Sequence, residues 1–328
     1  MSKALGRIAA FGIAKETTRG TSEAAATYYI PFDKVSIDEK KEFTLDEASR
    51  GVIEDSLGQS IVKEWVEGSI EAPVGDAHFP MVLYSLFGTL TTGDNADANV
   101  AVKDHTLTVA QSAQHQALSL FVDDPAGGQD YKHALGMVDS VDINYEQGKF
   151  LSYTASFKAK KGADATLTPS YTAENRFLPQ HLTFKMASAQ SGLTAASATV
   201  LKSANLKITQ NIEDDTVLGS TGPADFLNKQ FTVEGTIEAL WDAETLKDLF
   251  MAGTTRALRF DLKNTDVTIG TSASPEILID VYKATFTELT RPFETNNLIM
   301  QTLSFKGHYS TTDSKMITAI CTNIVASY

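Results

Sequence analysis

Val66-Glu67-Gly68-Ser69-Ile70-Glu71-Ala72 occurs a second time in the chain, as Val233-Glu234-Gly235-Thr236-Ile237-Glu238-Ala239. Six of the seven positions are identical, and the seventh exchanges serine for threonine. An apolar stretch ending in Leu86-Phe87-Gly88 follows the first copy, and one ending in Leu249-Phe250-Met251-Ala252-Gly253 follows the second. Further on, Ala155-Ser156-Phe157-Lys158 is echoed by Leu303-Ser304-Phe305-Lys306. The same features recur in the same order, which predicts two copies of one unit in tandem.

Both copies of this motif have the alternation of a half-buried β-strand. Successive side chains of a strand point to opposite faces, so Val66 and Ile70 share one face, as do Val233 and Ile237 in the second copy. This face can join a core, whereas the opposite face is acidic in both copies. The side chains on that polar face are Glu67, Ser69, Glu71, Glu234, Thr236 and Glu238.

The surrounding pattern predicts units that are mainly β with one short helix each, an α+β class. Strands are expected before the motif, at 32–37 and 200–208, and each unit ends in a hairpin, at 138–158 and 277–309. Long polar connections, residues 38–60 and 213–228, precede the motif in both units. Long loops at the same place in two copies are more often functional than accidental.

A helix is predicted after each copy of the motif. In the first unit an apolar stripe begins at Phe79, and Gly88 ends the helix. In the second, Asp242 suits the N-cap position and Gly253 suits a left-handed C-terminal cap.

Composition shifts place the boundaries. Residues 1–28 are small and polar, with little that could anchor a core, and are expected to form an extended arm that orders against a partner. The first unit then spans 29–160 and the second spans 199–312. Residues 161–198 are predicted to be a linker or second arm, with a strand at Leu182–Met186, and 313–328 a C-terminal tail.

Bulk composition excludes several protein classes. The 328 residues suffice for two domains, and 42% hydrophobic with 21% charged residues is typical of a folded chain. The single cysteine, Cys321, leaves no internal disulfide and fits a reducing compartment. No apolar run is long enough to span a bilayer, and the first residues lack the apolar core of a secretory signal. The net charge of −13 serves solubility and repels nucleic acid on average.

No catalytic or cofactor motif is present in the sequence. There is no phosphate-binding glycine loop, no His-Glu-x-x-His pair and no Gly-x-Ser-x-Gly turn, and the histidines are scattered. The best metal candidate combines Asp123, Asp124, Asp130 and His133, but its spacing matches no calcium loop. Because Pro125-Ala126-Gly127-Gly128 has the composition of a turn, a solvated acidic loop is the preferred interpretation, with no catalytic, cofactor or metal residue.

Several stretches resemble a known family. They are Gly12-Ile13-Ala14-Lys15-Glu16-Thr17-Thr18-Arg19-Gly20-Thr21, which leads into Tyr28-Tyr29-Ile30-Pro31-Phe32, then Ser49-Arg50-Gly51 and Glu174-Asn175-Arg176-Phe177. Together they resemble the major tail tube proteins of long flexible-tailed, siphovirus-type bacteriophages, and the first stretch is the most specific. The resemblance implies two tandem β-sandwich tail-tube domains, each with one short flanking helix, and a structural protein rather than an enzyme.

The resemblance also implies an assembly. In such tails six domains form a ring, one sheet from each lines an inner barrel, and stacked rings make the conduit through which the genome leaves. With two domains per chain, three chains are expected to close a pseudo-hexameric ring. The implied partners are further copies of the chain and the tape-measure, tail-terminator and distal tail proteins, with DNA passing unbound and no membrane. The implied location is the virion tail, after synthesis in the host bacterial cytoplasm.

Two sets of residues are candidates for roles in this assembly. Fixed negative charge on the wall repels phosphates, so the polar face of the two motif copies is expected to face the lumen: Glu67, Ser69, Glu71, Glu234, Thr236 and Glu238. Polar arms and loops without local apolar support are expected to order against the next ring: Lys15, Glu16, Arg19, Asp46, Glu47, Arg50, Asp214 and Asp215.

Three other readings stay open from the sequence alone. A secreted or surface β-sandwich adhesin would need a signal peptide and a ligand pocket. A hydrolase would need a dispersed catalytic set that no motif indicates. A tube of a contractile tail or a type VI secretion-like system would share the fold and differ in a sheath-binding surface.

Overall fold

The computed structural model describes residues 5–125, 128–241 and 244–328. The chain is mainly β, as predicted, with large antiparallel sheets consistent with β-sandwich domains and, in the described residues, two α-helices. The helices are α1 (Phe79–Phe87) and α2 (Thr245–Met251). The strands of the first half are β1 (Ala10–Lys15), β2 (Tyr28–Ile30), β3 (Lys34–Leu45), β4 (Gln59–Pro73), β5 (Gly88–Asp94), β6 (Lys103–Val109), β7 (Leu118–Asp123), β8 (Asp130–Tyr145), β9 (Ser152–Ala159) and β10 (Ala163–Ala165). Those of the second half are β11 (Leu182–Ala187), β12 (Ser203–Thr209), β13 (Ile212–Asp215), β14 (Asp225–Asn228), β15 (Thr232–Leu240), β16 (Arg256–Lys263), β17 (Glu276–Thr290), β18 (Met300–Gly307) and β19 (Ile317–Asn323).

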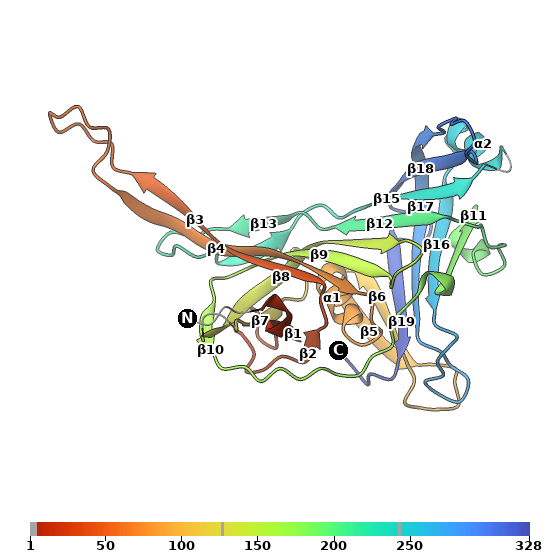
Figure 1. Cartoon of the computed structure of the whole chain (residues 1–328), viewed down its shortest axis with the longest axis horizontal. Helices are drawn as coiled ribbons and strands as arrows, with labels where there is room; N and C mark the ends of the chain where they lie inside the picture. The colour runs from red at the N-terminus through yellow and green to blue at the C-terminus, as the bar shows by residue number, and fades with distance from the viewer. Residues whose placement is uncertain (1–4, 126–127, 242–243) are drawn as a thin grey trace.

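One long antiparallel sheet runs through both halves of the chain. Its strand order is β3-β4-β9-β8-β12-β15-β18-β17. The sheet lies across the upper part of Figure 1, with β3 and β4 projecting beyond it as a hairpin and the C-terminus beneath it. The second layer under the first half contains β1, β2, β7 and β10, and β16, β19 and β11 continue from β17 in the second half.

The two motif copies occupy matching positions in this sheet. Gly68 of β4 lies opposite Ile37 of β3 on one side and Phe157 of β9 on the other. Gly235 of β15 lies opposite Leu206 of β12 and Phe305 of β18 in the same way. The set β3-β4-β9-β8 therefore has the same strand order as the set β12-β15-β18-β17.

Strand irregularities match as well. The β8–β9 pair shifts register between Val138 and Ser140, directly after the residue opposite Phe157. The β17–β18 pair shifts at the corresponding place, between Phe286 and Glu288. A β-bulge is a specific device that bends a strand, so its recurrence extends the likeness of the two sets beyond the motif.

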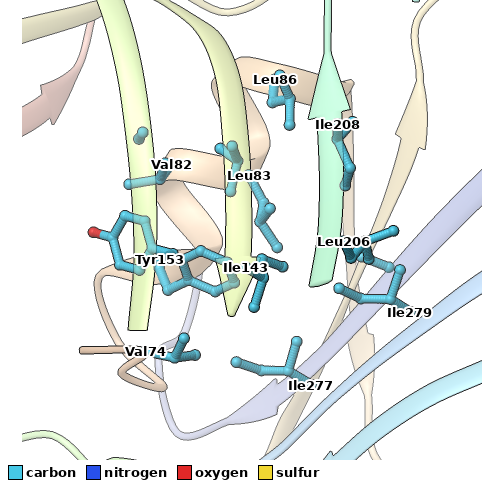
Figure 2. Close-up of a cluster of buried hydrophobic side chains, with 14 of the residues drawn as sticks. Val74, Val82, Leu83, Leu86, Ile143, Tyr153, Leu206, Ile208, Ile277 and Ile279 are labelled. Carbon is cyan, nitrogen blue, oxygen red and sulfur yellow. The ribbon is translucent and has the colours of Figure 1, made fainter. Parts of the chain in front are cut away.

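The hydrophobic core lies beneath the long sheet and is continuous across both halves. Figure 2 shows Val82, Leu83 and Leu86 of α1 directed at strand residues that include Ile143 of β8 and Leu206 of β12. All five side chains are at most 3% exposed. Burying a side chain of this size contributes about 1.5–3 kcal/mol relative to leaving it exposed. The helix therefore holds strands of both halves against one core.

The helix ends follow the predicted glycines. Gly88 caps α1 with a left-handed φ of 82°, and Gly253 has a φ of 60° just after α2. The predicted N-cap, Asp242, lies outside the described residues. The second helix is much less buried than the first, because Leu246 is its one buried residue among those described.

Three segments differ from the sequence-based expectation. Residues 10–15 form a buried strand, with Phe11 and Ile13 in the core, so the prediction that little in the N-terminal segment could enter a core is wrong. Much of the connection expected at 38–60 continues β3 and β4 as a projecting hairpin whose outer part is exposed on both faces. The expected tail contains β19, which pairs with β17 and β6 and buries Cys321.

We expect Gly68→Ala and Gly235→Ala each to destabilise the fold by about 1–3 kcal/mol, the usual cost of overpacking. A Cβ at either position would lie 2.6 Å from the ring of Phe157 or Phe305 and would also collide with a backbone carbonyl of the neighbouring strand. Urea denaturation checks this. Gly58→Ala and Gly93→Ala are matched controls, because nothing lies within 4 Å of a Cβ there. Equal midpoints for all four variants would contradict the close-packing argument.

Candidate assembly interface

The face of the long sheet opposite the core is polar over both halves. The six side chains of the two motif copies lie on it, because their neighbours Val66, Ile70, Val233 and Ile237 are at most 2% exposed on the core side. Glu67 accepts a hydrogen bond from the Trp65 indole N–H at 2.7 Å. Each of these acidic side chains therefore stands on a rigid strand.

Directly opposite residues form rows across this face, and one row carries both acidic and basic side chains. Its members, from β3 to β18, are Lys34, Glu71, Thr154, Asp142, Lys207, Glu234 and Lys306. The Glu234 and Lys306 side chains approach to 3.1 Å. The face therefore carries charges of both signs, and the acidity of the motif strands is partly compensated by lysines on their neighbours.

The two four-strand sets join within the chain along β8 and β12, a contact we call the seam. Its register runs from Ser140 opposite Thr209 to Tyr145 opposite Ala204. On the polar side the Asn205 side-chain amide donates to the Asp142 carboxylate and to the side-chain oxygen Oδ1 of Asn144, the latter at 2.9 Å. On the core side, Ile143 and Leu206 are fully buried. The seam is thus a complete sheet contact between two edges.

The outer ends of the long sheet have unused edges. Among the described residues β3 pairs with β4 alone, and residues 285–290 of β17 pair with β18 alone. An open strand edge exposes backbone N–H and C=O groups that template pairing with another chain. The edge strands of the molecule are therefore the counterparts of the two strands that meet in the seam.

A model of a phage tail tube protein family matches residues 6–307. The chain belongs to this family. No curated relative matches the sequence. Tail tube proteins are structural components of the virion tail and are not enzymes. The family implies self-assembly together with other tail proteins.

The described residues contain neither a long apolar helix nor a metal cluster. No helix there is long and apolar enough to cross a membrane, and no group of three or more His, Cys, Asp or Glu side chains could hold a metal ion. At the acidic loop, burial and the nearby Asp130 raise the pKa of Asp123, and His133 Nδ1 lies 3.1 Å from the Lys160 carbonyl oxygen. Residues 126–127 of the predicted turn lie outside the described residues.

Several stacking candidates of the tail tube protein are engaged inside the chain. Glu16 is 3% exposed and accepts the backbone N–H groups of Leu135 at 2.6 Å and Gly20 at 2.7 Å. Burial raises the pKa of the Glu16 carboxyl, and these hydrogen bonds oppose the shift. Lys15 donates to the Tyr328 carbonyl oxygen at 3.1 Å. These residues hold the N-terminal segment on its own subunit.

The other candidates lie on two hairpins. Asp46 pairs with Arg50 at 2.8 Å beyond the end of β3, where Glu47 is also exposed. Asp214 and Asp215 lie on β13, and the side chain of Asp215 is exposed.

The β13–β14 hairpin, residues 212–228, crosses over the first half in Figure 1, and we call it the clasp. Its Phe226 is fully buried in a small cluster with Ala117, Leu135 and Met137. Arg19 donates to the Asp225 carboxylate, with the shortest contact at 2.6 Å. Residue patterning does not predict the clasp, because Phe226 cannot be told from Val217 and Leu218, apolar residues of the same segment that are exposed, and its pocket comes from distant strands.

The Asp214 carboxylate fastens the clasp to the polar face of the first half. Lys63 donates to it at 2.7 Å and Lys158 at 2.8 Å, and its side chain is 11% exposed. Burial opposes ionisation of Asp214, but the hydrogen bonds and charges of Lys158 and Lys63 outweigh it and hold the pKa below its ordinary value. Asp225 has a lowered pKa as well, because Arg19 and Gln114 outweigh the effect of burial there.

We expect the clasp to loosen in acid. Because the pKa of Asp214 is lowered in the folded chain, its contribution is complete above the ordinary value of 3.8 and is lost as pH falls through the folded value. Lys63→Ala with Lys158→Ala removes the cause and should cost about 2 kcal/mol at neutral pH, the scale of hydrogen bonds to charged groups.

Fluorescence of Trp65, which packs beside Phe226, follows this opening in a Trp241→Phe background. Lys229→Ala is the matched control, since its pair with Glu213 is exposed. An acid transition of Trp65 unchanged in the double variant would contradict the assignment.

Proposed function

We propose that the chain is a tandem duplication of a tail tube domain and that three chains close each ring of a long, flexible phage tail. The repeated motif, the matching neighbours of Gly68 and Gly235 and the matching bulges support two equivalent domains, 29–160 and 199–312. Segments 1–28 and 161–198 then play equivalent parts, because β1 pairs with β7 as β11 pairs with β16.

The seam carries the proposal, because it is a template for the contact between chains. Ile37 matches Leu206, since each lies opposite the motif glycine, and Phe286 matches Val138, since each lies opposite the repeated phenylalanine. Transferring the seam register onto the open edges pairs β17 of one chain with β3 of the next. Glu288 of one chain then lies opposite Lys40 of the next, just as Ser140 lies opposite Thr209 in the seam.

Repetition of this contact three times closes the sheet into a barrel, and closure removes the open edges. Each chain supplies the eight strands of its long sheet. The core and α1 lie on one face, so the polar face lines the lumen. DNA passes along a wall whose glutamates repel phosphates and on which Lys306 is paired with Glu234.

Stacked rings form the conduit for genome ejection. The exposed charged tip of the β3–β4 hairpin, with Asp46, Glu47 and Arg50, is the surface we assign to contact with the next ring. Within the part of the chain that the structure describes, the one ion pair of these side chains is that between Asp46 and Arg50. The tape-measure, tail-terminator and distal tail proteins are the further partners of such a tube.

Native mass measurement of assembled rings should give three chains, and reversing one edge charge should weaken closure. Cross-strand charge pairs contribute about 0.2–1 kcal/mol each, and like charges cost a similar amount. Lys40→Glu and Glu288→Lys should therefore each raise the concentration needed for assembly several-fold, and the combined exchange should restore it. Circular dichroism confirms that each variant stays folded. Rings of six chains, or no rescue by the double exchange, would overturn the trimeric closure.

Lysine at four motif positions should make the tube retain DNA. Glu67→Lys, Glu71→Lys, Glu234→Lys and Glu238→Lys convert the wall, and changes at the exposed Glu71 and Glu234 typically cost within about 0.5 kcal/mol each. The half-buried Glu67 and Glu238 also lose the hydrogen bonds that they accept from Trp65 and Ser203, so circular dichroism checks that the variant stays folded. Release of DNA from reconstituted virions should slow at low salt and recover as salt rises. Four exposed acids outside the motif and the hairpin tip, Glu146, Asp164, Asp248 and Glu294, are the matched control for the same charge change. Equal release by both variants would remove the lumen assignment.

A further inference from the structure

The outer part of the β3–β4 hairpin has an apolar surface without an intramolecular cover. Phe43 and Leu45 of β3 are 48% and 51% exposed, and Ile61 and Val62 of β4 are 42% and 48% exposed. The hairpin stands away from the rest of the molecule in Figure 1. Apolar residues gathered at one place on a projecting ribbon mark a contact surface.

The clasp is the counterpart of this outer part, residue for residue. Phe43 lies opposite Ile61 as Ile212 lies opposite Asn228. Leu45 lies opposite Gln59 as Asp214 lies opposite Phe226. The intervals from the motif glycines are the same, because Phe43 follows Ile37 by as many positions as Ile212 follows Leu206.

The regular strand is interrupted at the same position in both hairpins, but the chain then continues in different directions. Pairing of β3 with β4 shifts register between Glu42 and Phe43, and the hairpin continues outward. In the second half the chain turns at the matching residue, Asn211, whose φ of 49° is left-handed. That turn folds the clasp down onto the neighbouring set of strands.

The clasp is seated directly beyond the seam. Asp139, the bulge residue of β8, accepts the Gln210 N–H on its carbonyl oxygen at 2.9 Å and the Ile212 N–H on its carboxylate at 2.9 Å. Phe226 is then buried and Asp214 reaches Lys158. Seating of the clasp is therefore continuous with the pairing of β12 on β8.

We propose that the outer part of the β3–β4 hairpin bends at its Glu42–Phe43 bulge and seats on the second domain of the neighbouring chain in the same ring. This inference rests on the proposed ring, because the outer part of the hairpin reaches the seat only if β3 pairs with β17 of that neighbour. The occupant of the apolar surface is thus a second copy of this chain.

The seat on the second domain is open and chemically adapted. Thr287 is the bulge residue of β17 and matches Asp139, so its backbone and hydroxyl oxygen are placed to accept from Lys41 and Phe43. Lys306 matches Lys158, and its side chain is 49% exposed against 26% for Lys158 under the clasp. Leu45 replaces Asp214, so this contact relies on apolar burial instead of the double lysine pair.

Cysteine cross-linking tests the seat in purified single rings. Phe43→Cys with Thr287→Cys should link neighbouring chains through a short bifunctional maleimide and give a covalent three-chain species on a denaturing gel. Ile212→Cys with Asp139→Cys is the matched internal pair and should link within one chain, in free chains and rings alike. Cys321 is 1% exposed and contributes little background.

Amide hydrogen exchange of the unsubstituted protein is a second test of the hairpin seat. Amide hydrogen exchange at residues 59–62 should slow in single rings relative to free chains, whether or not the cysteine variants assemble.

The outcomes separate this inference from the ring itself. Three-chain rings without the link and without slowed exchange overturn the hairpin seat and leave the ring intact. A link that forms in stacked tubes but not in single rings overturns it too, since the hairpin then reaches along the axis. Absence of three-chain rings overturns the proposed function instead.

Discussion

An edge strand of a β-sheet cannot leave its backbone donors and acceptors unpaired without inviting another strand, and the architecture of this chain follows from that constraint. At the seam, β12 satisfies the edge of β8, so two four-strand sets become one sheet over one core. Among the described residues, the outer edges of that sheet, on β3 and on residues 285–290 of β17, remain open. A subunit of this kind is complete as a fold and incomplete as a sheet, which suits a family whose members work as assembled tubes.

Much of this could be foreseen from residues that report their own environment. The alternation of apolar and polar residues in the motif predicted the strand and its buried face, and Gly88 predicted the end of α1. The need for glycine at position 68 could not be predicted from the sequence. It arises because the ring of Phe157, nearly ninety positions away in the chain, packs across the strand at this point. Close approach between distant segments leaves no local pattern.

The sequence-based predictions that failed also concern contacts between distant segments. Phe11 and Ile13 lie in a short run of alanines and glycine, so the N-terminal segment has too weak a local signal to indicate that β7 pairs with it. Glu16 looks like a surface residue until the amides of Leu135 and Gly20 are found around it. The compensation of Glu234 by Lys306 depends on strand register, which a single sequence does not specify. Charge on one strand was therefore predictable, whereas the charge of the whole face was not.

The seam affects the rate at which tube assembly can nucleate. Its two strands belong to one chain, so they meet at a high effective concentration, of the order of millimolar for short linkages, instead of at the concentration of free protein. If three chains close a ring, as we propose, half of the contacts around the barrel are made during folding, before any encounter. The equilibrium concentration of rings would then rise with the third power of the subunit concentration, where a single-domain protein with six subunits would need the sixth. The proposed duplication would thereby lower the kinetic order of nucleation while leaving the wall of the tube the same.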